Sequence, residues 1–364
     1  MKAVILVGGK ATRLLPLTRH TPKSMVPVLN IPFLEHVIRH LGSHQVKEIV
    51  LAQGHLSQPI EDYFGDGSRF DVKLHYAVED TPRGTGGAVK NAAGHLDDTF
   101  LVLNGDVFTD LDITGMVAFH RERQAKATIA LTPVEDPTAY GLVETETDGR
   151  VVRFLEKPSW DEVLQRKTNM INAGTYILEP DILAQIPPER EVSIERETFQ
   201  QLLAQEEPMY AYSSSAYWLD MGTPERYLQL HRDILDGKCP RCALAPDMKV
   251  VIEKPGNVHP AVRLEPPVVI GANCSIGEGV RLVGPVVIGA GSTILEDSLI
   301  ENCIIWRNAR LGPRVRLKDS ILADNCRFGA DTIGEGVVVG DNVTVLSGIK
   351  LEPGSKIEPG TTIG

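Results

Sequence analysis

The sequence predicts an α/β protein in two parts, a mostly parallel sheet followed by a parallel β-helix. Over residues 1–235, short β-rich runs alternate with helical patterns, which is typical of a parallel sheet covered by helices on both faces. From about residue 258, an apolar residue recurs at every sixth position, a period that is neither helical nor that of a simple hairpin. We therefore expect domains at 1–235 and 258–364, with a linker at 236–257.

The first domain is expected to contain eight strands and at least three helices. Strands are predicted at Ala3–Val7, Glu48–Ala52, Lys73–Val78, Phe100–Asn104, Thr128–Thr132, Val151–Leu155, Gly174–Leu178 and Met209–Tyr212. Helices are predicted at Pro32–Leu41, Gly86–Ala93 and Ile194–Leu203. Ligands of such open sheets bind outside the carboxyl ends of the strands, so polar residues that follow a strand are the first candidates for function.

The second domain has a hexapeptide repeat, and Gly, Asn, Asp and Pro fill the turns between its apolar positions. The apolar series comprises Val258, Leu264, Ile270, Ile276, Leu282, Ile288, Ile294, Ile300, Trp306, then after a slip Ile333, Val339, Val345, Leu351, Ile357 and Ile363. Stacked coils leave an apolar interior that needs capping at its ends. We therefore expect this domain to support a homo-oligomer.

Composition argues against several classes of protein. The chain has 364 residues and a formal net charge of −11, whereas a protein that binds duplex nucleic acid usually carries a basic face. The apolar run Ala3–Val7 is too short for a signal peptide or a membrane span. Five cysteines without a dense framework suit a reduced, cytoplasmic protein.

The strongest chemical signal is the loop that follows the first strand. Gly8 and Gly9 let backbone N–H groups approach an anion, and Arg13 and Lys23 downstream add charged donors for phosphate. The alternative is a tight turn with incidental surface cations. A dinucleotide site is disfavoured because no Gly-x-Gly-x-x-Gly is present.

Two aspartates and one lysine stand in further motifs. Asp106 follows the apolar run Leu101–Asn104, which directs a carboxylate into the expected ligand crevice. Asp220 lies in Trp218-Leu219-Asp220-Met221-Gly222, and Lys157 lies in Phe154-Leu155-Glu156-Lys157-Pro158. Taken alone, each aspartate could equally be a cap or turn residue, and Lys157 an ordinary exposed lysine.

The segment Gly8–Pro27 resembles the signature of sugar-1-phosphate nucleotidyltransferases, and the resemblance extends over residues 1–235. The chain looks most similar to the mannose-1-phosphate guanylyltransferase branch, in which a hexapeptide tail also occurs. The resemblance implies a Rossmann-like sheet, a left-handed β-helix with three hexapeptides per coil, and Mg²⁺ as cofactor.

The resemblance also assigns roles to residues of this chain. It implies that Arg13, Lys23 and Lys157 are catalytic and that Asp106 and Asp220 bind the metal. The nucleotide-binding residues would be Leu6, Gly8, Gly9, Ala11, Thr12, Gln53, Gly84, Thr85, Asn104 and Gly105. The sugar-phosphate-binding residues would be Tyr140, Gly141, Glu156 and Asn172.

Two positions depart from the family signature: Ala11 replaces a glycine, and Ser24 replaces a frequent proline. If the backbone at Ala11 is left-handed, its Cβ costs on the order of 1 kcal/mol.

The implied reaction is transfer of a nucleotidyl group from an NTP to a sugar 1-phosphate, with release of pyrophosphate. GTP and mannose 1-phosphate are favoured because Ser193–Phe199 resembles a segment of the guanylyltransferase branch. The alternatives are thymidylyl or uridylyl transfer to glucose 1-phosphate, and a non-catalytic homologue.

The second domain is not expected to be an acyltransferase, because no histidine follows His259 to act as a base. In the linker, Cys239-Pro240-Arg241-Cys242 lacks a second pair of ligands. A turn with free thiols is favoured over zinc, and a zinc site shared across a subunit interface stays open.

Overall fold

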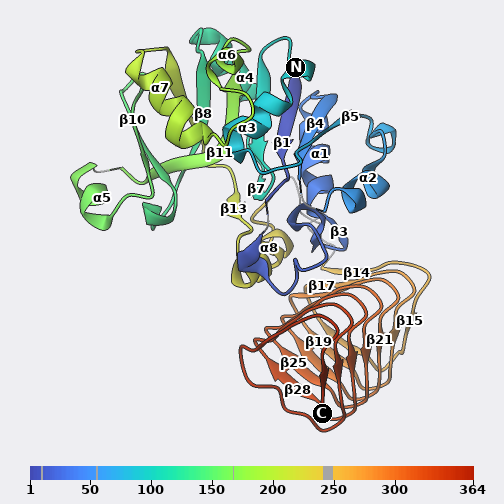
Figure 1. Ribbon diagram of the computed structural model, residues 1–364. Helices are drawn as coiled ribbons and strands as arrows, with labels where there is room; N and C mark the ends of the chain where they lie inside the picture. The colour runs from blue at the N-terminus through green and yellow to red at the C-terminus, as the bar shows by residue number, and fades with distance from the viewer. Residues whose placement is uncertain (10, 55, 167, 241–248) are drawn as a thin grey trace. The chain divides into compact units, whose positions relative to one another are not determined.

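A computed structural model describes residues 1–9, 11–54, 56–166, 168–240 and 249–364 (Figure 1). The chain forms two compact units. One consists of Met1–Gly9 and Val37–Asp220, and the other of Lys10–His36 and Met221–Gly364. These units reflect packing, whereas the domains predicted at 1–235 and 258–364 follow the sequence pattern and stay a prediction. Cys242 lies outside the described residues.

The first unit is built on a nine-stranded mixed sheet. Its path runs β10-β9-β11-β6-β1-β4-β5, and β8 pairs with both β11 and β12. The strands are β1 (Lys2–Leu6), β4 (Glu48–Gln53), β5 (Lys73–Val78), β6 (Phe100–Asn104), β8 (Ala127–Pro133), β9 (Gly141–Thr145), β10 (Val151–Glu156), β11 (Met170–Leu178) and β12 (Met209–Ser213). The predicted α/β class is confirmed, and each predicted strand is present within a few residues.

Strand direction divides this sheet into two halves. β6, β1, β4 and β5 are parallel to one another, whereas β11 is antiparallel to β6, β8 and β9. An apolar run indicates a strand but not its direction, so the antiparallel half was not predicted.

Helices, and a two-stranded sheet of β7 (Val107–Thr109) and β13 (Trp218–Asp220), complete the first unit. The helices that lie wholly in it are α2 (Gln58–Phe64), α3 (Gly84–Asn91), α4 (Ile113–Glu122), α5 (Trp160–Arg166), α6 (Ile182–Gln185) and α7 (Phe199–Ala204), with the short 3-10 turns η3 (Ser68–Phe70), η4 (Ala93–His95) and η5 (Pro137–Ala139). The predicted helix at 194–203 is a π-helix, η6 (Ile194–Thr198), that runs into α7. Helix α1 (Phe33–Ser43) has residues in both units.

The second unit contains a three-sided parallel β-helix, whose strands stack coil upon coil (Figure 1). One side contains β14 (Val250–Ile252), β17 (Val268–Ile270), β20 (Val286–Ile288), β23 (Ile304–Ile305), β26 (Ile321–Leu322), β29 (Val338–Val339) and β31 (Lys356–Ile357). The second side contains β15 (Asn257–Val258), β18 (Ser275–Ile276), β21 (Thr293–Ile294), β24 (Arg310–Leu311), β27 (Arg327–Phe328), β30 (Thr344–Val345) and β32 (Thr362–Ile363). The third contains β16 (Arg263–Glu265), β19 (Arg281–Val283), β22 (Leu299–Glu301), β25 (Arg316–Lys318) and β28 (Ile333–Glu335).

The register between coils explains the slip in the repeat. Val268 pairs with Val286, eighteen residues further along, so this coil holds three hexapeptides. Ile304 pairs with Ile321, seventeen residues further along, so a coil in the middle is one residue shorter. The predicted β-helix is confirmed, and the slip arises because successive central coils each lack one residue.

The interior of the β-helix is apolar and includes three cysteines, Cys274, Cys303 and Cys326. Burial raises the pKa of the Cys303 and Cys326 thiols to about 12. These two side chains therefore stay protonated and act as small apolar groups. Within the part of the chain that is described, no helix is long and apolar enough to cross a membrane.

The remaining elements of the second unit come from the N-terminal loop and from residues just before the β-helix. They are η1 (Thr12–Leu14), η2 (Lys23–Met25), the short strands β2 (Pro27–Val28) and β3 (Ile31–Pro32), and helix α8 (Pro224–Leu235). Thr223 caps α8, because its side chain accepts a hydrogen bond from the Arg226 N–H.

Candidate active site

The carboxyl ends of β1, β4 and β6 lie at one edge of the sheet in the first unit. Leu6 is paired with Ala52 on one side and with Asn104 on the other. Gln53 and Asn104 therefore lie on either side of the point where β1 leads into Gly8 and Gly9. A Cβ on Gly8 would lie 3.2 Å from the Gly54 nitrogen, so the two backbone segments approach closely. The sequence prediction that these residues share one edge is consistent with this register.

Two buried oxygens at this edge have no hydrogen-bond partner among the described residues, Gln53 Oε1 and Asn104 Oδ1. Gln53 Nε2 donates to Glu61 Oε1 at 2.6 Å, which fixes the amide orientation because a carboxylate only accepts. An unsatisfied buried acceptor costs about 1–3 kcal/mol. A ligand with N–H or O–H donors would remove that cost at both positions.

Asp106 and Asp220 come together through the small sheet of β7 and β13. Asp220 pairs with Val107, the residue that directly follows Asp106. Gly105 makes this turn possible: its N–H donates to the Leu6 carbonyl at 3.0 Å, and a Cβ there would lie 2.4 Å from that oxygen. Asp106 lies in the turn directly before β7, and Asp220 is the last residue of β13, so the two residues are neighbours along this pair of strands.

This pair of carboxylates fits Mg²⁺, which commonly takes one or two carboxylates from the protein and further oxygens from substrate phosphates and water. Among the described residues, no group of three or more His, Cys, Asp or Glu side chains is placed to hold an ion. Asp106 and Asp220 stay the candidate metal ligands predicted from the sequence.

The residues predicted to contact the sugar phosphate also lie together in the first unit. Glu156 pairs with Gly141 between β10 and β9, and the Lys157 N–H donates to the Tyr140 carbonyl at 2.8 Å. Lys157 is exposed and has φ 52°, a left-handed conformation that is costly for a lysine. Burial, reinforced by the nearby carboxylate of Glu195, raises the pKa of the Glu156 carboxyl.

Sequence reasoning missed the side chain that connects the two halves of this site, Glu195. Its Oε2 accepts hydrogen bonds from Thr85 Oγ1 at 2.8 Å and Ser193 Oγ at 2.9 Å. Its Oε1 accepts from the Tyr176 hydroxyl at 3.1 Å, and that hydroxyl accepts from Asn172 Nδ2 at 2.8 Å. Burial and Glu195 together raise the pKa of Tyr176 well above its usual range, so it remains a donor.

This network joins Thr85, predicted to bind the nucleotide, to Asn172, predicted to bind the sugar. Glu195 lies in η6, and π-helical turns are frequent at functional sites. The signal was present in the sequence, because Ser193–Phe199 stood out as similar to the guanylyltransferase branch. This resemblance identified the segment but not Glu195 itself, because Glu195 is hydrogen-bonded to Thr85, 110 positions earlier in the chain.

After Gly9, the signature loop belongs to the second unit. Ala11 has φ 46° and ψ 41°, so the left-handed backbone considered from the sequence is present, with a Cβ on it. The Ala11 carbonyl accepts from the Thr18 hydroxyl at 2.9 Å and from the Leu14 N–H at 3.1 Å. Arg13 lies in η1, and Lys23 begins η2. The roles of Ala11, Thr12, Arg13 and Lys23 stay predictions from the motif.

Buried hydrogen bonds join this loop to α8 and to the β-helix. The Tyr227 hydroxyl donates to the Pro27 carbonyl and accepts from Trp306 Nε1 at 3.0 Å. The Leu29 N–H donates to His231 Nε2 at 3.2 Å, and Asn30 Nδ2 donates to the Ile288 carbonyl at 3.0 Å. The Tyr227, His231 and Trp306 side chains are almost completely buried. Helix α8 and the β-helix therefore hold the segment that directly follows Lys23.

Comparison with known proteins gives the family. Residues 2–237 match the nucleotidyl transferase family, and residues 247–364 match the GMPPB C-terminal domain. A mannose-1-phosphate guanylyltransferase of Mycobacterium tuberculosis is 37% identical over 92% of this chain and 82% of its own length. A UTP–glucose-1-phosphate uridylyltransferase of Synechocystis is 34% identical over 93% of this chain and 91% of its own length.

Among solved structures, HddC from Yersinia pseudotuberculosis complexed with GMP-PN is similar, with a TM-score of 0.55 and 29% identity over 64% of this chain and 98% of that chain. The chain belongs to the nucleotidyl transferase family, and it is an enzyme that transfers a nucleotidyl group to a sugar 1-phosphate.

Proposed function

We propose that this enzyme joins GTP to mannose 1-phosphate, giving GDP-mannose and pyrophosphate. The observation that carries the proposal is the Glu195 network, which connects Thr85 on the nucleotide side to Asn172 on the sugar side. Glu195 lies in the segment that most resembles the guanylyltransferase branch. Relatives named mannose-1-phosphate guanylyltransferase, including those of Mycobacterium tuberculosis and Yarrowia lipolytica, support the same choice.

The reaction needs no nucleophilic side chain, because the phosphate of a sugar 1-phosphate is itself an anionic nucleophile. Its oxygen attacks the α-phosphorus of the NTP in line, and pyrophosphate leaves. The protein has to position two polyanions and neutralise their charge. We assign this work to Lys157 on the sugar-phosphate side and, from the signature motif, to Arg13 and Lys23.

Gln53 and Asn104 have a separate role in this proposal. Their partnerless buried oxygens are acceptors for nucleotide N–H or O–H groups. A guanine base carries such N–H donors, so an orphaned amide oxygen at the end of β4 is consistent with GTP.

Mg²⁺ would be held by Asp106 and Asp220, and when bound it would supply positive charge to the phosphates and to the leaving pyrophosphate. The wider setting is also a proposal. Reduced cysteines suit the cytoplasm, and the exposed ends of the β-helix suit association of copies of this chain.

The rival assignment is uridylyl or thymidylyl transfer to glucose 1-phosphate, for which the Synechocystis relative is the specific support. A pyrophosphate-release assay with Mg²⁺ would compare GTP, ATP, UTP and dTTP, each with mannose 1-phosphate and with glucose 1-phosphate. We expect the highest kcat/KM for GTP with mannose 1-phosphate. A clear preference for UTP or dTTP with glucose 1-phosphate would overturn the substrate assignment.

A further inference from the structure

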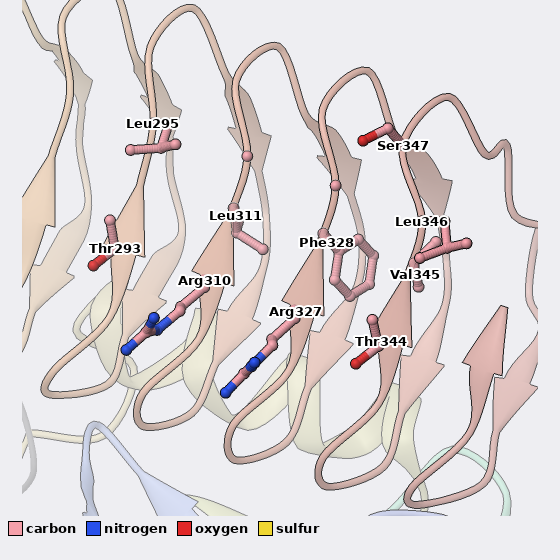
Figure 2. A pocket seen from close by; sticks show the side chains of 12 residues that line it. Thr293, Leu295, Arg310, Leu311, Arg327, Phe328, Thr344, Val345, Leu346 and Ser347 are labelled. Carbon is pink, nitrogen blue, oxygen red and sulfur yellow. The ribbon is translucent and has the colours of Figure 1, made fainter. Parts of the chain in front are cut away.

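One face of the β-helix carries a groove of about 460 Å³, within the range of about 300–1,000 Å³ that is usual for small-molecule sites. The groove lies on the side of the β-helix formed by β21, β24, β27 and β30 (Figure 2). It is lined by Thr293, Leu295, Arg310, Leu311, Gly312, Arg327, Phe328, Gly329, Thr344, Val345, Leu346 and Ser347.

Two arginines dominate the polar lining of the groove. Arg310 and Arg327 are paired in register on neighbouring strands, and their side chains project side by side in the same direction (Figure 2). Neighbouring strands are about 4.8 Å apart, so the two positive charges are held close together. Like charges directly opposite each other destabilise a sheet, and this arrangement therefore favours an anion between them.

Neither guanidinium group forms a hydrogen bond or an ion pair with any residue that the structure describes. Two other arginines of the β-helix are neutralised: Arg314 pairs with Asp331 at 2.7 Å, and Arg281 with Glu265 at 2.9 Å. No Asp or Glu lines the groove, although the chain as a whole has a net charge of −11. The two donors of the groove are therefore available to a ligand.

The rest of the groove supplies hydroxyl and apolar contacts. Thr293 and Thr344 flank the arginine pair in the same row of the sheet. Two positions further along each strand, the row is Leu295, Gly312, Gly329 and Leu346, so glycines form a floor between two half-exposed leucines. The groove therefore combines an apolar floor with a pair of cationic donors beside it.

We propose that this groove binds a phosphate-bearing small molecule of nucleotide size, with its phosphates held by Arg310 and Arg327. Guanidinium groups match phosphate oxygens because each presents a planar fork of N–H donors. This site belongs to the β-helix alone and does not depend on the catalytic assignments above.

The test uses the full-length chain with GDP and, separately, inorganic pyrophosphate as probes, and counts bound equivalents by titration calorimetry without Mg²⁺. The decisive variant is Arg310→Gln/Arg327→Gln. The matched control is Arg263→Gln/Arg316→Gln, which removes two arginines that lie in a different sheet and are not register neighbours.

We expect two classes of site for GDP in the wild type and in the control. In the Arg310/Arg327 variant, one class should bind about tenfold to a hundredfold more weakly, as expected from the loss of charged hydrogen bonds. Pyrophosphate should show the same loss. The thermal midpoint of this variant should not fall, because removing adjacent like charges relieves repulsion.

Equal stoichiometry and affinity in the wild type and the Arg310/Arg327 variant would overturn the proposal. An equal loss in the control would also overturn it, since that would indicate unspecific charge attraction. If the Arg310/Arg327 variant instead changed the mass of the assembly in light scattering while GDP binding stayed the same, the groove would be a protein contact and the proposal would be wrong.

Discussion

Two sets of buried polar atoms, one in each unit of this enzyme, differ in how their hydrogen bonds are satisfied. In the first unit, the ends of β4 and β6 present buried oxygens on Gln53 and Asn104 that have no partner among the described residues. In the second unit, the Tyr227 hydroxyl is bonded on both sides, to Pro27 and to Trp306. We interpret the two partnerless amide oxygens as candidate ligand contacts, and the Tyr227 hydroxyl, bonded on both sides, as a support for the loop.

From this difference we infer separate roles for the two units. We expect the sheet of the first unit to supply acceptors and carboxylates for substrates and metal. We expect the contacts with α8 and the β-helix to hold the loop that carries the predicted phosphate-binding cations. Rigid support of this kind matters because positioning accounts for much of catalysis when the protein supplies no nucleophilic side chain. Substitutions in the two regions should therefore change different quantities: mainly kcat in the first unit, and both kcat/KM and thermal stability in the second.

The largest effect is expected from the carboxylates of the first unit. Asp106→Asn and Asp220→Asn should each lower kcat by about 10²–10³-fold, because charge stabilisation at the reacting phosphates is lost. Pyrophosphate release over a Mg²⁺ titration measures this, and circular dichroism checks that the fold is kept. Near-normal turnover in either variant would show that its carboxylate does not hold the ion.

A smaller loss is expected from the support of the loop. Tyr227→Phe leaves the Pro27 carbonyl and the Trp306 N–H buried without their partner, at a cost of about 1–3 kcal/mol for each group. We expect about a tenfold decrease in kcat/KM together with a lower thermal midpoint. Tyr210→Phe is the control, since Tyr210 lies in β12 of the first unit and its ring packs on Phe119. If Tyr227→Phe lowered stability but left kcat/KM unchanged, the β-helix would not position the loop for catalysis.

The stability of this anchored segment should depend on pH, because it includes the buried side chain of His231. Burial lowers the pKa of His231 to about 4, from an ordinary value of 6.5. The folded protein thus takes up this proton only near pH 4, while the unfolded chain takes it up below 6.5. The contribution of His231 to the free energy of unfolding is full above pH 6.5 and should fall by up to about 3 kcal/mol as the pH decreases to 4. A proton on Nε2 would also face the Leu29 N–H, which now donates to it.

Urea unfolding between pH 7 and pH 4 measures this loss, and His231→Gln, which cannot gain a proton, isolates it from the other histidines. The variant should show a shallower decrease in stability with falling pH. An identical pH profile for wild type and variant would assign the loss to other groups.

The smallest effect concerns Ala11. Its φ of 46° is strained for alanine, so Ala11→Gly should relieve on the order of 1 kcal/mol, partly offset by the greater freedom of glycine in the unfolded chain. Turnover should be equal or slightly higher, as measured by the same pyrophosphate assay. A large loss of activity would mean that the alanine methyl group makes a contact needed for catalysis.

Much of the candidate site could be predicted because its residues follow strands that the sequence reveals. A buried parallel strand reads as a continuous apolar run, so the positions after β1, β4 and β6 could be located, and with them Gly8, Gln53 and Asn104. The period of six likewise predicted the β-helix, since each coil repeats the same inward-facing positions. The direction of β11 could not be predicted, because burial of a strand is independent of the direction of its neighbours.

The sequence by itself determined the α/β class, the β-helix and the presence of phosphate- and metal-binding residue types, because these depend on local period and on motif. Only the tertiary structure decided that Asp220 pairs beside Asp106, that Glu195 joins Thr85 to Asn172 through Tyr176, and that the signature loop is anchored by Tyr227 and Trp306. Three of these contacts join residues that are 79 (Tyr227–Trp306), 110 (Thr85–Glu195) and 200 (Pro27–Tyr227) positions apart in the chain. No local pattern encodes them, since they arise only when strand pairing and coil stacking bring distant side chains within hydrogen-bond distance.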